Sequence, residues 1–147
     1  MASTYLSLHY HIMFGTKNRA PLIDIEWRSR LHEYLGGTIR GLGGFPEGIG
    51  GIEDHVHLLA SLKSMHCLAD VMRELKKASS IWIHDTFGEK QFGWQEGYAA
   101  FTVSASSLDA VKKYIAHQEQ HHRVKSFREE LVEILEKAGV DYNPDYL

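Results

Sequence analysis

Hydrophobic and polar residues alternate along three stretches of the chain, residues 4–14, 55–62 and 98–104. A period of two predicts β-strands, because side chains two apart in a strand lie on the same face. His55 and His57 therefore share one face of the second stretch and leave the apolar residues between and after them for the core. His9 and His11 form a similar pair in the first stretch, so the spacing alone does not say whether either pair is a site.

Eight glycines lie between residues 36 and 51. They predict a loose helix end, structural turns and a short strand at 49–52 that forms a hairpin with residues 55–62. A phosphate-binding loop is the alternative, but the order Gly-x-Gly-x-x-Gly followed by a helix is missing. We therefore expect these glycines to serve the fold.

Apolar residues three and four apart predict helices over residues 24–42, 64–87 and 108–122, the first capped by Asp24. A capping box opens a last helix at Ser126. The order is strand, helix, strand, strand, helix, strand, with two more helices. It predicts an α+β, ferredoxin-like antiparallel four-stranded sheet backed by helices, with additional C-terminal helices. The length fits one domain over residues 1–147.

Composition narrows the class of protein. Hydrophobic residues make up 44% of the chain, but no apolar run is long enough to span a membrane. Met1–Tyr5 lacks the charged start and apolar stretch of a secretory signal, and the single cysteine, Cys67, forms no internal disulfide. We expect a cytoplasmic protein without a membrane partner.

The net charge of −3 argues at first against a nucleic-acid partner. Residues 129–147, however, hold six acidic residues and one basic residue, so residues 1–128 carry 15 basic and 13 acidic residues. A mildly basic body can bind a phosphate backbone locally. The charge therefore neither demands nor excludes nucleic acid.

Tyr114 and Gln118 lie four residues apart on the predicted helix 108–122, and thus on one face. One interpretation is a tyrosine at the edge of the core on a solvated helix, with His121 and His122 as solvated helix-end residues, although either histidine could also add a ligand or a phosphate contact. The other is chemical. A tyrosine oxygen can attack phosphorus, and two imidazoles leave room on a divalent ion for an amide oxygen such as that of Gln118.

Two motifs carry a resemblance to a known family. His55-Val56-His57 resembles the His-hydrophobic-His motif of the HUH endonuclease superfamily. Tyr114-Ile115-Ala116-His117-Gln118 resembles the Tyr-Ile-x-x-Gln helix of its single-tyrosine insertion-sequence transposases, the transposase A-like family. Similar segments span nearly the whole chain, and the paired motifs lie in the expected order.

The resemblance implies a DNA transposase that cuts and rejoins single-stranded DNA at hairpin-marked element ends. Tyr114 would form a covalent 5′-phosphotyrosine intermediate, and His55, His57 and Gln118 would hold Mg²⁺ or Mn²⁺. It also implies a homodimer in which the tyrosine helix of one subunit serves the histidine pair of the other. Two alternatives stay open: a domesticated single-tyrosine nuclease that processes repeated palindromes, and a non-catalytic nucleic-acid-binding module.

Overall fold

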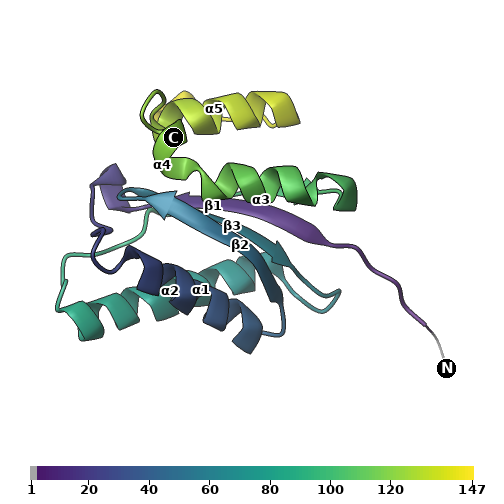
Figure 1. Ribbon diagram of the computed structural model, residues 1–147, viewed down its shortest axis with the longest axis horizontal. Coiled ribbons are helices and arrows are strands. Elements are labelled where there is room, and N and C mark those ends of the chain that lie inside the picture. The colour runs from purple at the N-terminus through teal and green to yellow at the C-terminus, as the bar shows by residue number, and fades with distance from the viewer. Residues whose placement is uncertain (1–2) are drawn as a thin grey trace.

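A computed structural model describes residues 3–147, so the first two residues of the stretch compared with a secretory signal lie outside it. In this part of the chain, strands and helices follow one another as shown in Figure 1. The elements are β1 (His9–Gly15), α1 (Arg28–Gly41), β2 (Phe45–Ile52), β3 (His55–Ser61), α2 (Leu68–Phe87), β4 (Ala99–Val103), α3 (Leu108–Ala116), α4 (Gln118–His121) and α5 (Phe127–Ala138). Short 3₁₀ turns lie at Lys17–Arg19, Ala105–Ser107 and Pro144–Tyr146.

The strands form one antiparallel sheet in the order β2-β3-β1-β4, with β3 and β1 in the centre. Helices α1 and α2 cover one face, and α3, α4 and α5 lie on the other (Figure 1). This order of strands and helices is the ferredoxin-like arrangement. The predicted α+β fold class is therefore confirmed.

Alternation along the central strands gives the two faces of the sheet different contents. The face toward α1 and α2 is a closed apolar core that includes Ile12, Phe14, Val56 and Leu58. The opposite face presents buried imidazoles, and Met13 packs there in a smaller apolar cluster with three residues of α5. The predicted sharing of one face by His55 and His57 is what the strand shows.

The first strand and the first helix begin later than predicted. The first strand begins at His9 rather than at residue 4, because His9 lies opposite Ser61 and Val103, the last residues of both neighbouring strands. Residues before it have no strand to pair with on either side. The first helix begins at Arg28, because Asp24 accepts a hydrogen bond from the backbone of Glu26 and forms a turn instead of a helix cap.

The glycine-rich segment forms a longer strand than predicted, from Phe45 to Ile52 instead of residues 49–52. Gly50 explains why glycine lies within a strand here. A Cβ atom on Gly50 would lie 2.2 Å from the backbone oxygen of Ile115, so α3 packs directly on the strand backbone. The glycine allows the close approach of a helix rather than a turn.

The predicted helix 108–122 is broken. Helix α3 ends at Ala116, and His117 has φ −106° and ψ 28°, outside the helical range. Its backbone N–H donates to the oxygen of Tyr114, three residues back, and its Nδ1 bonds the oxygen of Lys113. Gln118 starts the separate short helix α4, so Tyr114 and Gln118 lie on two helices rather than on one.

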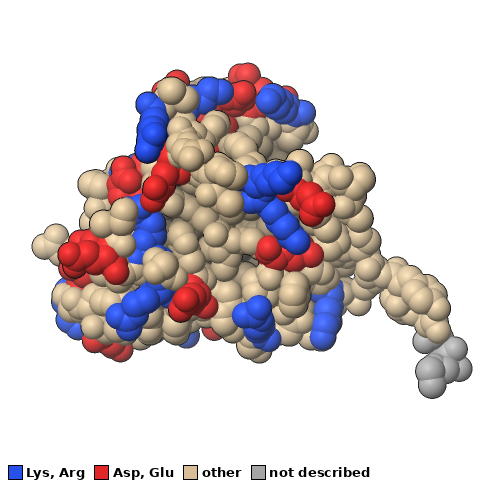
Figure 2. Space-filling view, viewed as in Figure 1, with Lys and Arg blue, Asp and Glu red and all other residues tan. Residues whose placement is uncertain are grey.

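Basic and acidic side chains are interspersed over the face seen in Figure 2, and neither kind gathers into one patch. The charge distribution on this face therefore neither demands nor excludes the binding of nucleic acid. Among residues 3–147, no helix combines the length and the apolar character needed to cross a membrane.

The close approach of α3 to Gly50 predicts that a larger side chain at this position destabilises the fold. We expect Gly50→Ala to lower the free energy of unfolding by about 1–3 kcal/mol or more, because the added methyl group meets backbone that cannot rotate away. Gly37→Ala in α1 is the control, since a Cβ there meets nothing within 4 Å and should stabilise the helix by about 0.5–1 kcal/mol. Urea unfolding measures both. Equal stability of the two variants would contradict the packing described.

Candidate active site

The four residues singled out from the sequence meet on the sheet face that carries α3, α4 and α5. His55 and His57 come from β3, and both are fully buried. Gln118 at the start of α4 places its Oε1 3.1 Å from His55 Nε2. The ring of Tyr114, from α3, lies 5.8 Å from the ring of His57, centre to centre. All four belong to one chain, so the tyrosine lies beside its own histidine pair.

Two further residues complete this cluster. Glu130 of α5 is 1% exposed, and its Oε1 lies 3.0 Å from His57 Nε2, 3.1 Å from His122 Nε2 and 3.5 Å from His55 Nε2. The ligand atoms of His55, His57, His122 and Glu130 all lie within 4.8 Å of one another. Gln118 Oε1 lies 2.9 Å from His122 Nε2 and faces the same centre.

The outward nitrogens of these imidazoles have partners that fix the rings. His55 Nδ1 donates to the carboxylate of Asp54 at 2.7 Å, and His122 Nδ1 donates to the backbone oxygen of Lys125 at 2.6 Å. In their neutral forms both imidazoles therefore turn the lone pair of Nε2 toward the centre. His57 Nδ1 lies 2.8 Å from His11 Nε2. Partners of this kind orient metal-binding imidazoles, so the donor set fits a divalent ion.

The pKa shifts of the residues in this cluster are those of a site that favours positive charge. Burial alone would raise the pKa of Glu130, but its contacts with His122, His55 and His57 lower that pKa far below the usual range. Burial lowers the pKa of His57, against the attraction of Glu130. The pKa of His55 is raised, because its hydrogen bonds to Asp54 and Glu130 outweigh burial. The cluster thus holds an ionised carboxylate among imidazoles.

Tyr114 joins the cluster through its hydroxyl, which donates a hydrogen bond to Glu130 Oε2. Burial and this bond to an anion raise the pKa of Tyr114 above its ordinary value, so the phenol is protonated in this arrangement. A cleft of about 670 Å³ opens beside it between β4, α3 and α5, and its lining includes Phe101 and Ser107. Tyr114 itself lines this cleft.

The place of Glu130 in the cluster was not predicted from the sequence, and the favoured prediction for His122 was wrong. Glu130 was counted only among the acidic residues of the C-terminal segment, yet it lies with Phe127, Leu131 and Leu135 on the buried stripe of α5. An acidic residue at an apolar position of an amphipathic helix was the signal that could have found it. His122 was interpreted as a solvated helix-end residue, but its side chain is 3% exposed.

Comparison with known proteins identifies the family of this chain. A family model described as "Transposase IS200 like" matches residues 4–118. The chain belongs to the IS200-like transposase family. The match includes His55, His57, Tyr114 and Gln118 and ends before His122 and Glu130. Among curated proteins, none matches this transposase sequence.

Two solved structures share the fold of this transposase. One, from Deinococcus radiodurans R1, is provisionally described as a transposase; it is 24% identical, with a TM-score of 0.63 over 78% of this chain and 94% of that one. The other is a REP-associated tyrosine transposase bound to a REP hairpin; it is 15% identical, with a TM-score of 0.56 over 78% of this chain and 70% of that one. At these identities, both likenesses support the fold only.

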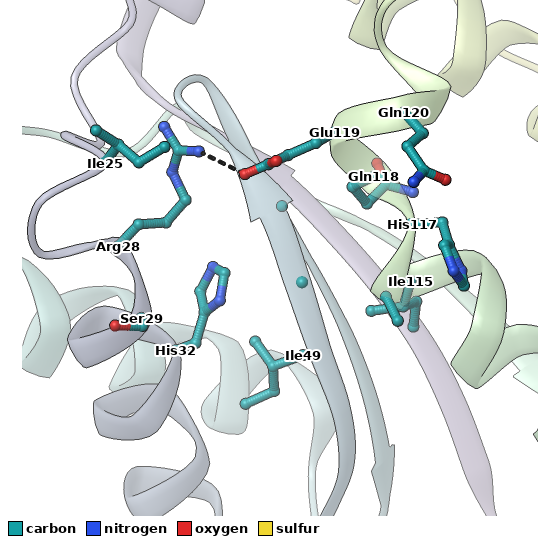
Figure 3. Close-up of a pocket in the computed structure, with 13 residues that line it drawn as sticks. Ile25, Arg28, Ser29, His32, Ile49, Ile115, His117, Gln118, Glu119 and Gln120 are labelled. Carbon is teal, nitrogen blue, oxygen red and sulfur yellow. Dashed lines mark ion pairs between the residues drawn. The ribbon is translucent and has the colours of Figure 1, made fainter.

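A second pocket, of about 400 Å³, lies between the first turns of α1 and the break that separates α3 from α4 (Figure 3). Arg28 and Glu119 form an ion pair across it at 3.6 Å. His32 lines the pocket, and its Nε2 is buried without a hydrogen-bond partner. Burial, together with the charge of Arg28, lowers the pKa of His32 to about 4.

This lowered pKa predicts acid sensitivity. Between pH 6.5 and about pH 4 the unfolded chain binds a proton at residue 32 that the folded chain does not, so the free energy of unfolding falls as the pH falls. His32→Gln should flatten this dependence, by at most about 1.4 kcal/mol per pH unit. His117→Gln, which removes an exposed imidazole, is the control. Urea unfolding across this range measures the slopes, and an unchanged slope for His32→Gln would refute the assignment.

Proposed function

We propose that this transposase cleaves and rejoins single-stranded DNA through a covalent bond between Tyr114 and a 5′-phosphate. One observation carries the proposal: the Tyr114 hydroxyl bonds the carboxylate that also lies 3.0 Å from His57 Nε2. The nucleophile and the candidate metal centre are thus in contact within one chain. Phosphoryl transfer needs little beyond such positioning and stabilisation of negative charge.

In the cleavage step the Tyr114 oxygen forms a bond to the phosphorus of the scissile phosphate. The bond between phosphorus and O3′ breaks, the phenol loses its proton and the leaving oxygen gains one. In the rejoining step a 3′-hydroxyl attacks the phosphotyrosine and releases Tyr114. Both steps exchange one phosphodiester bond for another, so no further reactant is required.

His55, His57 and Gln118 are the residues proposed to hold a divalent ion such as Mg²⁺ or Mn²⁺. When bound, the ion would neutralise charge on the phosphate oxygens and orient the group for in-line attack. Asp54 and His11 would keep the imidazoles turned toward it.

The proposed substrate is single-stranded DNA next to a hairpin, because one structural neighbour is a tyrosine transposase bound to a REP hairpin. The cleft beside Tyr114 supports an unpaired strand, since an aromatic side chain such as Phe101 offers a stacking surface for an unstacked base. A homodimer stays part of the proposal. The exchange of tyrosine helices between subunits is a prediction that differs from the arrangement in the single chain, where Tyr114 lies at its own site.

The test is covalent capture. Incubation with single-stranded oligonucleotides taken from the DNA on either side of the coding sequence, in the presence of Mn²⁺, should give a protein–DNA adduct that survives denaturing electrophoresis. Tyr114→Phe should lose the adduct by several orders of magnitude, because the attacking oxygen is gone. Its affinity for the same oligonucleotide, measured by fluorescence anisotropy, should be retained.

Tyr146→Phe is the matched control, because this tyrosine is 87% exposed and lies outside the site. It should form the adduct like the parent. An adduct of equal yield in Tyr114→Phe would refute the proposed nucleophile. Binding without any adduct in the parent protein would instead support the non-catalytic nucleic-acid-binding module.

A further inference from the structure

We propose that His122 and Glu130 are metal ligands together with His55 and His57, and that this set binds a first-row transition-metal ion such as Zn²⁺ in preference to Mg²⁺. The proposal rests on the proposed function in taking this cluster as the metal centre, and it differs in that His122 and Glu130, rather than Gln118, complete the ligand set around His55 and His57. Both added residues lie outside the segment that matches the family, residues 4–118.

Distances support one shared ion. Glu130 Oε1 lies 3.0, 3.1 and 3.5 Å from the Nε2 atoms of His57, His122 and His55. Ligands at about 2.1 Å from one tetrahedral Zn²⁺ ion lie roughly 3.4 Å apart. A small movement of these side chains would therefore place all four atoms on one ion.

The chemistry of the facing atoms points the same way. The Nδ1 protons of His55 and His122 are engaged outward by Asp54 and Lys125, so their inward nitrogens are acceptors. The carboxylate of Glu130 is an acceptor as well. The hydroxyl of Tyr114 and the amide of Gln118 donate to Oε2 of Glu130. Oε1 of Glu130 and the inward nitrogens of the neutral imidazoles still face one another as buried acceptors, which is costly unless a proton or a cation lies among them.

Helix α5 positions the carboxylate of Glu130 beside the imidazoles. The capping box of Ser126 and Glu129 fixes where the helix begins. Phe127 stacks on His55 with ring centres 4.1 Å apart and planes 8° apart. One turn further, Glu130 faces the imidazoles. A contact this close ties the position of α5 to that of the metal centre.

The ligand types decide the selectivity. Mg²⁺ takes oxygen ligands in octahedral geometry and keeps several waters. Three imidazoles and one carboxylate form a nitrogen-rich set, and affinity for such sets rises along the first transition row from Mn²⁺ to Cu²⁺, with imidazole also well suited to Zn²⁺. Side chains at 0–3% exposure also leave little room for the waters that Mg²⁺ retains.

Metal binding without DNA tests the proposal. The metal-free full-length protein is titrated with Zn²⁺, Mn²⁺ and Mg²⁺ in competition with a chromogenic chelator. We expect Zn²⁺ to bind most tightly, Mn²⁺ more weakly, and Mg²⁺ weakest of all. Glu130→Gln and His122→Ala should each weaken Zn²⁺ binding at least about tenfold, since even the outer partners of ligands contribute 10–100-fold to affinity.

Glu136→Gln is the control, because Glu136 lies on the same helix, is exposed and pairs with Tyr142 instead. It should bind Zn²⁺ like the parent. The melting temperature of each variant without metal separates lost ligands from lost folding: a variant that melts like the parent but binds weakly has lost a ligand.

The outcomes separate this proposal from the proposed function. Parent-like Zn²⁺ binding by folded Glu130→Gln and His122→Ala would overturn the four-ligand set, even if Tyr114 forms its DNA adduct. Mg²⁺ binding as tight as Zn²⁺ binding would overturn the selectivity. Ligand-dependent Zn²⁺ binding without any adduct would support the four-ligand set and refute the proposed function.

Discussion

Buried acceptor atoms that face one another constrain the rest of this structure. Nitrogens of His55, His57 and His122 meet oxygens of Gln118 and Glu130 in a largely buried cluster. Such atoms repel one another unless a proton or a metal ion lies among them. The elements that supply them must therefore be held firmly, and the fold does this by drawing them from a central strand and from the helices packed on its face.

Backbone features position these elements. The missing side chain of Gly50 lets α3 pack against β2, which brings Tyr114 beside the sheet. The break at His117 turns Gln118 toward His55 instead of continuing the face of α3. The capping box at Ser126 fixes the start of α5. Three local features, each with a physical cause, thus place Tyr114 next to the candidate metal centre.

What the sequence could predict follows from the range of the interactions. Alternation alone placed His55 and His57 on one face, and the capping box alone placed the last helix, because both depend on neighbouring residues. The length of β2 and the break at His117 depend on packing between distant elements. Glu130 meets His57 across 73 residues of sequence, so local pattern showed only an acidic residue on an apolar stripe. The roles of Tyr114 and its neighbours stay predictions that chemistry has to test.

The measurement that tests the central claim most directly is anomalous diffraction at the zinc edge from crystals of the full chain grown with Zn²⁺. We predict one strong peak about 2.1 Å from the Nε2 atoms of His55, His57 and His122 and from the carboxylate of Glu130, adjacent to Tyr114. A peak at another place on the chain, with the imidazoles and Glu130 still in direct contact, would contradict the claim that this cluster is the metal centre.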